Sequence, residues 1–212
     1  MPRITEERRE ARREQILDAA RACVLEHGLE AVSMEMIIAR SGLSTGAVYR
    51  YFKGKDEIIA AAVTSAAAEI GAAAVPILAS PNPGPPSQLV EKLLAGWLSY
   101  SHSGVGAAAG IDRMPAAVHG WSYAQTDPEI KATLQAGLRG FREHCVRIVK
   151  QWQTDGVVAA SAEPDAVAQL ILSICLGFVA QRSLSGGAEV DVQAHASALA
   201  ALTTASAARP KA

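Results

Sequence analysis

Hydrophobic positions recur every three or four residues along almost the whole chain, which is the period of an α-helix. In the first such stretch Ile16, Leu17, Ala20 and Val24 share one face, and charged residues occupy the other. The same pattern continues to the alanine-rich C-terminal segment, so the sequence predicts an all-α fold. We expect about nine helices, over residues 5–27, 33–41, 45–52, 55–74, 86–101, 112–123, 128–155, 164–184 and 191–207.

Several residues predict where these helices begin and end. Gly28 suits the end of the first helix, because glycine accepts the left-handed backbone that often follows a helix. Asp127 before Pro128 favours the start of the longest helix. Pro76 disfavours helix at the residue before it, so we expect the fourth helix to end or kink there. Residues 80–86 contain four prolines and predict a loop.

Residues 33–55 read SMEMIIARSGLSTGAVYRYFKGK and have the outline of a helix-turn-helix. Ser33 suits the N-cap of the first short helix. Gly42 permits the sharp turn, Leu43 fills the space beneath it, and Ser44 caps the second short helix. A helix-turn-helix of this kind is a common DNA-binding unit.

The second short helix has the features of a reader of the DNA major groove. Its N-terminal residues Thr45, Gly46 and Ala47 are small, which allows close approach to base edges. The larger polar residues that follow can reach phosphates, which fixes the register on DNA without reading its sequence. The expected DNA contacts are Ser33, Ser44, Thr45, Gly46, Ala47, Tyr49, Arg50, Tyr51 and Lys55.

The run from Ser44 to Ile58 resembles the signature of the TetR family of bacterial transcriptional regulators, a Ser-x-Gly-x-x-Tyr-x-(His or Tyr)-Phe-x-x-Lys pattern. The resemblance covers residues 12–59, and Met36 and Ile38 depart from the residues usual in the family. It implies a helix-turn-helix DNA-binding domain over residues 1–54 and a helical ligand-binding and dimerisation domain over residues 55–212. It also implies a homodimeric repressor that leaves its operator DNA when a small-molecule effector binds.

The resemblance points to an effector site among the fifth to seventh helices, which surround the ligand in the family. Aromatic residues gather in this part of the chain and few charges lie near them. Small-molecule sites are usually concave and apolar with a few polar groups, so we expect a largely apolar effector. A place in the protein core is the competing interpretation for each residue. The expected lining residues are Trp97, Tyr100, Met114, His119, Trp121, Tyr123, Phe141, His144 and Cys145.

The eighth helix is apolar on nearly every side, and such a helix must be covered on every side. A modest domain can hardly bury all sides of its penultimate helix. We therefore expect the last two helices to form a four-helix bundle with those of a second subunit, as the family resemblance also implies. A symmetric dimer is what two operator half-sites require. The expected interface residues are Leu170, Ile171, Ile174, Phe178, Leu199 and Leu202.

Charges are nearly balanced, with 20 Lys and Arg against 21 Asp and Glu. Residues 1–55 hold 10 Lys and Arg and 8 Asp and Glu, which favours contact with a polyanion only mildly. The arginines near the N-terminus form either a basic arm that touches phosphate or a solvated face interleaved with glutamates. They are Arg3, Arg8, Arg9, Arg12 and Arg13.

We expect a cytoplasmic protein that makes no membrane contact. The N-terminus has no apolar segment of the kind found in a secretory signal. Residues 166–184 are the one candidate membrane segment, but they include Gln169, Gln181 and Arg182. Polar residues of this kind favour a buried helix in a soluble protein.

No catalytic motif occurs at a defensible spacing, and the histidines are scattered, so we expect no enzyme activity, metal or cofactor. The three cysteines, Cys23, Cys145 and Cys175, lie far apart and outside any CxxC pair. Two alternatives to the effector-released repressor stay open. One is a regulator controlled by a protein partner or by oxidation of Cys145 or Cys175. The other is a helical enzyme or ligand carrier whose helix-turn-helix is incidental.

Overall fold

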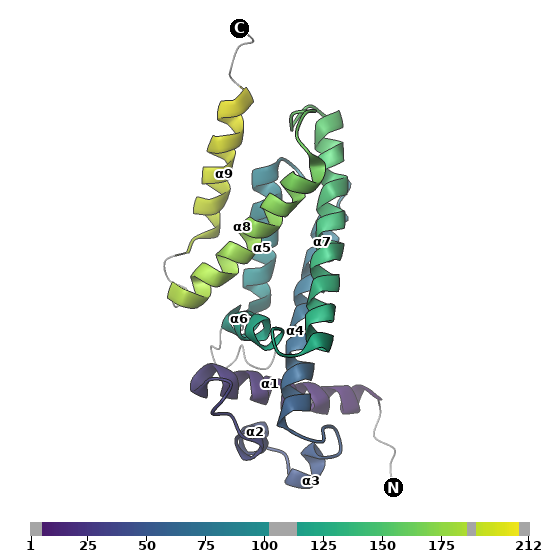
Figure 1. The fold of residues 1–212 in the computed structure, drawn as a ribbon, viewed down its shortest axis with the longest axis vertical. Coiled ribbons are helices and arrows are strands. Elements are labelled where there is room, and N and C mark those ends of the chain that lie inside the picture. Colours follow the sequence, from purple (N-terminus) through teal and green to yellow (C-terminus); the bar gives the residue numbers. More distant parts are fainter. Residues whose placement is uncertain (1–5, 102–113, 186–189, 208–212) are drawn as a thin grey trace. The chain divides into compact units, whose positions relative to one another are not determined.

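The computed structural model describes residues 6–101, 114–185 and 190–207. Every regular element within these residues is an α-helix, which confirms the expected all-α fold (Figure 1). The expected helix starts at residues 5 and 112 lie outside the described residues. The helices are α1 (Glu6–His27), α2 (Met34–Ser41), α3 (Thr45–Val48), α4 (Lys55–Leu78), α5 (Pro86–Ser101), α6 (Met114–Tyr123), α7 (Pro128–Thr154), α8 (Pro164–Ser185) and α9 (Val192–Ala207).

Helix ends lie where capping side chains predicted them. The Ser33 hydroxyl accepts a backbone N–H in the first turn of α2, at 3.3 Å. Gly42 has φ 66°, the left-handed conformation that ends α2. The carboxylate of Asp127 accepts the backbone N–H groups of Glu129 and Ile130, at 2.9 and 3.0 Å, and so caps α7.

The fourth and third helices differ in length from the prediction. Helix α4 continues two residues past Pro76. Proline removes only its own N–H, and Ala79 still donates to the carbonyl of Val75 at 2.8 Å. Helix α3 ends at Val48, four residues before the expected end. The carbonyl of Val48 accepts from both Tyr51 and Phe52, at 2.9 and 3.1 Å, so the chain turns tightly there.

The chain divides into two compact units. The first unit comprises Met1–Ala67 and Ser101–Leu134, and the second comprises Ala68–Tyr100 and Gln135–Ala212. Helices α4 and α7 each run from one unit into the other, and α6 belongs wholly to the first. The functional boundary expected between residues 54 and 55 is a different division, and it stays a prediction.

The first unit encloses a core beneath the helix-turn-helix. Helix α1 packs on α2 and on α6. Its buried face meets Ile37 of α2, Val48 of α3 and Ile58 of α4, all fully buried. Met36 and Ile38 pack against this core from α2. A helix as short as α3 is unstable alone, so its place depends on this core.

The second unit is held together by contacts between distant segments. Phe178 in α8 is fully buried and meets the ring of His195 in α9 edge-on, with centroids 5.5 Å apart. Arg142 Nε in α7 lies 3.3 Å from Asp165 Oδ1 in α8. Fully buried leucines from α5 supply much of the core: Leu89, Leu93 and Leu94.

Two helices among the described residues, α4 and α8, are long and apolar enough to cross a membrane by length and composition alone. In α8 six residues are buried within the second unit, and Asp165 and Arg182 lie near its two ends. A core helix of a soluble protein has these properties too.

Candidate functional site

Helix α3, the second short helix of the helix-turn-helix, presents small, exposed residues at its N-terminal end. Ser44 caps the helix by accepting the N–H of Ala47 at 3.3 Å. Val48 points into the core and is fully buried, whereas Thr45 and Gly46 are exposed. The cap and the buried valine therefore hold the small residues outward, where a base edge can approach them.

The residues after α3 bring larger polar groups to the same part of the unit. Tyr49 is 51% exposed and Arg50 is also exposed. Tyr51 is half-buried and packs against the core. Lys55 begins α4. The turn before it is closed by the backbone N–H of Lys53, which donates to the carboxylate of Glu57 in α4 at 2.6 Å. Of these four expected contacts, Tyr49 and Arg50 are therefore exposed, whereas Tyr51 and Lys55 are half-buried.

Ser33 is already engaged within the first unit. Besides capping α2, its hydroxyl donates to the carboxylate of Glu35, and this hydrogen bond lowers the pKa of Glu35. All nine expected DNA contacts lie in one unit, but Ser33 and Ser44 serve local structure as caps. Their direct contact with DNA stays a prediction.

Helix α1 is tied to the helix-turn-helix by side chains that the sequence did not single out. The Gln15 amide donates to the carbonyl of Ser41 at 2.7 Å, at the start of the turn. Ser41 is buried, and its hydroxyl accepts the N–H of Leu43 at 3.2 Å. At the other end of α1, Arg40 donates to Glu26 at 2.5 Å, and this bond lowers the pKa of Glu26.

The expected effector residues fall into two sets. Met114, His119, Trp121 and Tyr123 lie on α6 in the first unit. The other five lie on α5 and α7 in the second unit: Trp97, Tyr100, Phe141, His144 and Cys145. Their joint role in one site stays a prediction, and each set is described within its own unit.

In the second unit the indole N–H of Trp97 is a buried hydrogen-bond donor. The side chain is 6% exposed, and its ring lies 6.1 Å from that of Phe141. The indole Nε1–H is buried and meets no acceptor within the part of the chain that the structure describes. Cys145, one turn beyond Phe141, is fully buried, and burial raises the pKa of its thiol to about 12. His144 instead turns its Nδ1 to Arg147.

In the first unit Tyr123 packs against the helix-turn-helix core. Burial raises the pKa of its hydroxyl, and the carboxylates of Asp56 and Asp127 add to the effect. A β-carbon added at Gly120 would lie 3.0 Å from Val63, so α6 and the first half of α4 approach closely there. The glycine allows that approach.

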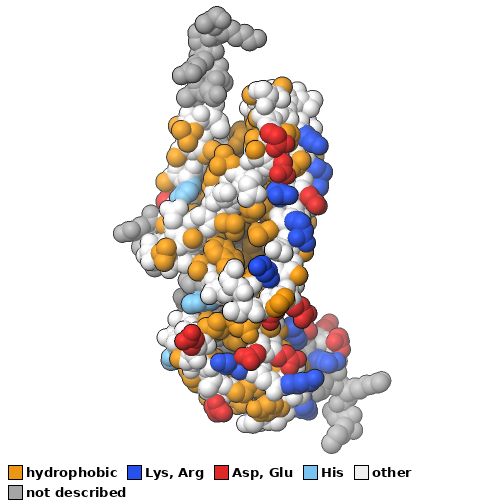
Figure 2. Space-filling view, in the orientation of Figure 1, with side chains coloured by type: hydrophobic (Ala, Val, Ile, Leu, Met, Phe, Trp, Pro, Cys, Tyr) orange, Lys and Arg blue, Asp and Glu red, His pale blue; other side chains and the backbone are white. Residues whose placement is uncertain are grey.

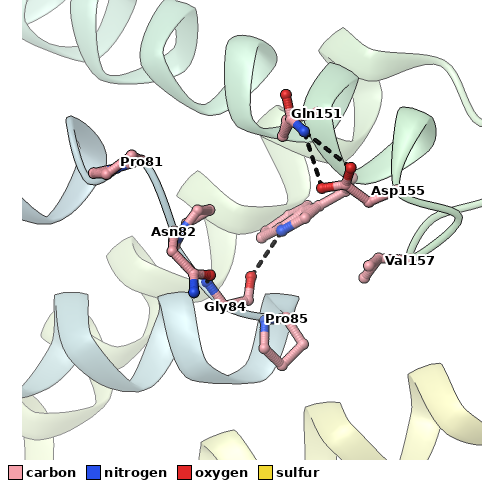
Figure 3. A pocket seen from close by; sticks show the side chains of 9 residues that line it. Pro81, Asn82, Gly84, Pro85, Gln151, Asp155 and Val157 are labelled. Atoms are coloured by element: carbon pink, nitrogen blue, oxygen red, sulfur yellow. Dashed lines mark hydrogen bonds between the residues drawn. The ribbon is translucent and has the colours of Figure 1, made fainter.

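A hollow of about 240 Å³ lies in the second unit between the proline-rich loop and the end of α7 (Figure 3). None of the expected effector residues lines it. Asn82, Gln151 and Asp155 supply its polar groups, and Gln151 donates to both oxygens of Asp155, at 2.9 and 3.0 Å. The remaining lining residues are Pro81, Pro83, Gly84, Pro85, Trp152 and Val157.

The expected interface residues also differ in exposure. Leu170 is 58% exposed and Leu202 is 75% exposed, whereas Ile171 and Phe178 are buried within the chain. Ile174 and Leu199 are half-buried. Hydrophobic side chains gather over α8 and α9 in Figure 2. Leu170 and Leu202 therefore offer the apolar surface that a second subunit could cover.

Among the described residues, no group of three or more His, Cys, Asp or Glu side chains is placed to hold a metal ion.

Two family models match the chain. Residues 16–62 match the model described as "Bacterial regulatory proteins, tetR family". Residues 109–206 match the model described as "BetI-type transcriptional repressor, C-terminal". The first match contains the helix-turn-helix, and the second runs from before α6 almost to the end of α9.

Individual relatives agree with these matches. The regulator BetI of Serratia proteamaculans is 25% identical over 186 residues, which is 87% of each chain. A transcriptional repressor of Mycobacterium tuberculosis is 38% identical over 58 residues, which span 27% of this chain and only 31% of that relative. The solved structure of SmeT, the repressor of the Stenotrophomonas maltophilia multidrug efflux pump SmeDEF, is 25% identical with a TM-score of 0.64 and covers 92% of this chain and 89% of that chain.

Proposed function

Because this chain belongs to the TetR family of bacterial regulatory proteins, we propose that it is a cytoplasmic, non-enzymatic repressor that binds operator DNA as a homodimer. The carrying observation is the exposed Thr45–Gly46 surface, held outward by the Ser44 cap and the buried Val48. Thr45, Gly46 and Ala47 read base edges, and Tyr49, Arg50, Tyr51 and Lys55 hold the DNA backbone.

Repression follows from the pairing of two recognition helices. In the dimer they lie about one DNA turn apart, roughly 34–36 Å, and the bound protein occludes a promoter. The uncovered Leu170 and Leu202 supply apolar surface for the second copy. The naming of SmeT as the repressor of an efflux pump supports repression as the outcome of DNA binding.

The effector that releases the DNA is a neutral, largely apolar molecule with at least one hydrogen-bond acceptor. Trp97 supports this class, because its buried N–H meets no acceptor among the described residues and leaving such a donor unpaired costs about 1–3 kcal/mol. The effector must bind the DNA-free conformation more tightly than the DNA-bound one, by on the order of 5 kcal/mol, to reduce DNA occupancy from nearly full to nearly absent.

Oxidation of a cysteine is a less suitable releasing signal than an effector, because of where the cysteines of the second unit lie. Cys145 and Cys175 are fully buried, and burial raises the pKa of both thiols, that of Cys145 to about 12. The thiolate is the form that reacts with oxidants. We therefore propose an effector and not oxidation as the releasing signal.

Binding to DNA from upstream of the coding sequence, measured with unrelated competitor DNA at two salt concentrations, tests the repressor. The proposal expects a complex that survives competitor and weakens as salt rises. Equal affinity for competitor and upstream DNA would contradict it. Neutral aromatic compounds can then be screened for release of that complex, with anionic compounds of similar size as the control class.

A further inference from the structure

The recognition helix is too short to hold its own direction. Helix α3 has four residues, and the three residues after it form a tight turn that ends at Phe52. A single helical turn gains little from its own hydrogen bonds. Its orientation therefore depends on how its two ends are attached to the rest of the first unit.

Both ends are attached to α1. Before α3, Gln15 donates to the carbonyl of Ser41 at 2.7 Å. After α3, the guanidinium carbon of Arg13 lies over the ring of Phe52, 5.7 Å from its centroid. Phe52 is 4% exposed and belongs to the core of the unit, so the ring is a fixed platform. A cation within about 6 Å of a ring centroid is attracted to the ring face.

We infer that Arg13 is a positioning residue for DNA recognition, which acts by clamping Phe52 and so setting the direction of α3. Its side chain is 37% exposed, and Glu10 lies 3.5 Å from its guanidinium. This exposed pair lies along α1 on the same side as the ring and contributes little stability of its own. The ammonium of lysine is also attracted to a ring face, so a lysine at this position would keep part of the clamp.

A direct phosphate contact from Arg13 would have a different signature. Phosphate contacts strengthen binding to every DNA sequence alike. Removing one of them reduces the slope of log affinity against log salt concentration by about one. A misdirected recognition helix instead loses affinity for the preferred sequence alone. The two roles therefore differ in their effect on sequence preference and in their effect on the salt dependence of binding.

The test compares two duplexes, one enriched by the wild-type chain from a random-sequence pool and one with the same bases scrambled. We expect Arg13→Met to lower affinity for the enriched duplex by about three- to fivefold. The affinity for the scrambled duplex should stay unchanged, as should the slope of log affinity against log salt concentration. Arg9→Met is the matched control, since Arg9 is exposed one turn earlier on α1, and it leaves the ratio of the two affinities unchanged.

Unchanged affinity of Arg13→Met for the enriched duplex, or an equal loss on both duplexes with a shallower dependence on salt, would overturn the positioning role. Phe52→Leu gives an independent check, because it removes the ring and keeps an apolar filler. In that background Arg13→Met should have no further effect on the ratio of the two affinities, and an additional loss as large as that of Arg13→Met alone would also overturn the inference. All affinities are measured well below the melting temperature of each variant, so that loss of folded protein does not enter.

Discussion

The indole Nε1–H of Trp152, near the end of α7, donates a 2.7 Å hydrogen bond to the carbonyl oxygen of Gly84, which lies 68 residues earlier in the chain (Figure 3). Trp152 is 2% exposed, so this bond is shielded from water. It fixes the proline-rich loop to α7 within the second unit. The bond gives the loop a structural role that its composition alone did not suggest.

Trp152→Phe should therefore destabilise the protein by about 2 kcal/mol, because the variant lacks this hydrogen bond and has a smaller ring. Urea unfolding followed by circular dichroism measures the change. Gln151→Ala is the control, because Gln151 is exposed and its side chain bonds only locally, to Asp155 just past the end of α7. A destabilisation in Trp152→Phe no larger than in the control would contradict the role of the bond.

A second prediction concerns the stability of the turn in the helix-turn-helix. Gly42 has φ 66°, and a β-carbon there would meet no atom within 4 Å, so only backbone strain opposes a side chain. Gly42→Ala should cost about 1 kcal/mol of unfolding free energy, and Gly42→Asn should cost less. Gly71→Ala in α4, where φ is not positive, should instead stabilise the protein by roughly 0.5–1 kcal/mol. An unchanged stability in Gly42→Ala would show that the turn tolerates another conformation.

The recognition surface makes a third prediction, on DNA affinity. Tyr49→Ala and Lys55→Ala should weaken binding to preferred and scrambled duplexes alike, because phosphates are common to both. Lys55→Ala should also reduce the salt slope by about one, since one fewer phosphate is neutralised by the protein. Changes at Thr45 or Ala47 should alter which bases are preferred. Full affinity in Tyr49→Ala would mean that α3 does not face DNA as proposed.

The cysteines make a fourth prediction, on reactivity. All three are buried, and burial raises the pKa of each thiol, that of Cys145 to about 12. Because a thiol must lose its proton to react, the folded protein should resist iodoacetamide at pH 7.5 and react fully in urea. Ser161→Cys adds an exposed thiol as a positive control. Rapid modification of Cys145 in the folded protein would restore thiol oxidation as a candidate signal.

Much of the fold could be predicted because it depends on neighbouring residues. Ser33, Gly42 and Asp127 cap or end helices through groups two or three residues away, so their types and spacing sufficed. Pro76 misled the prediction of the helix end, since it costs one hydrogen bond and the remaining bonds carry α4 onward.

Contacts between distant segments could not be predicted. Nothing in a single sequence pairs Arg13 with Phe52 or Trp152 with Gly84, because each pair meets only after the units fold. The same limit applies to Tyr123. Its packing against the helix-turn-helix core was not predicted, and its part in an effector site stays a prediction.

Dimeric, sequence-specific binding to DNA can be tested by selection of the preferred DNA sequence. Purified protein is used to enrich duplexes from a random-sequence pool at physiological salt, and the recovered sequences are aligned. A dimeric repressor should enrich an inverted repeat whose half-sites are centred about one helical turn, roughly 10 base pairs, apart. A pool that shows no common sequence after repeated rounds would contradict sequence-specific binding.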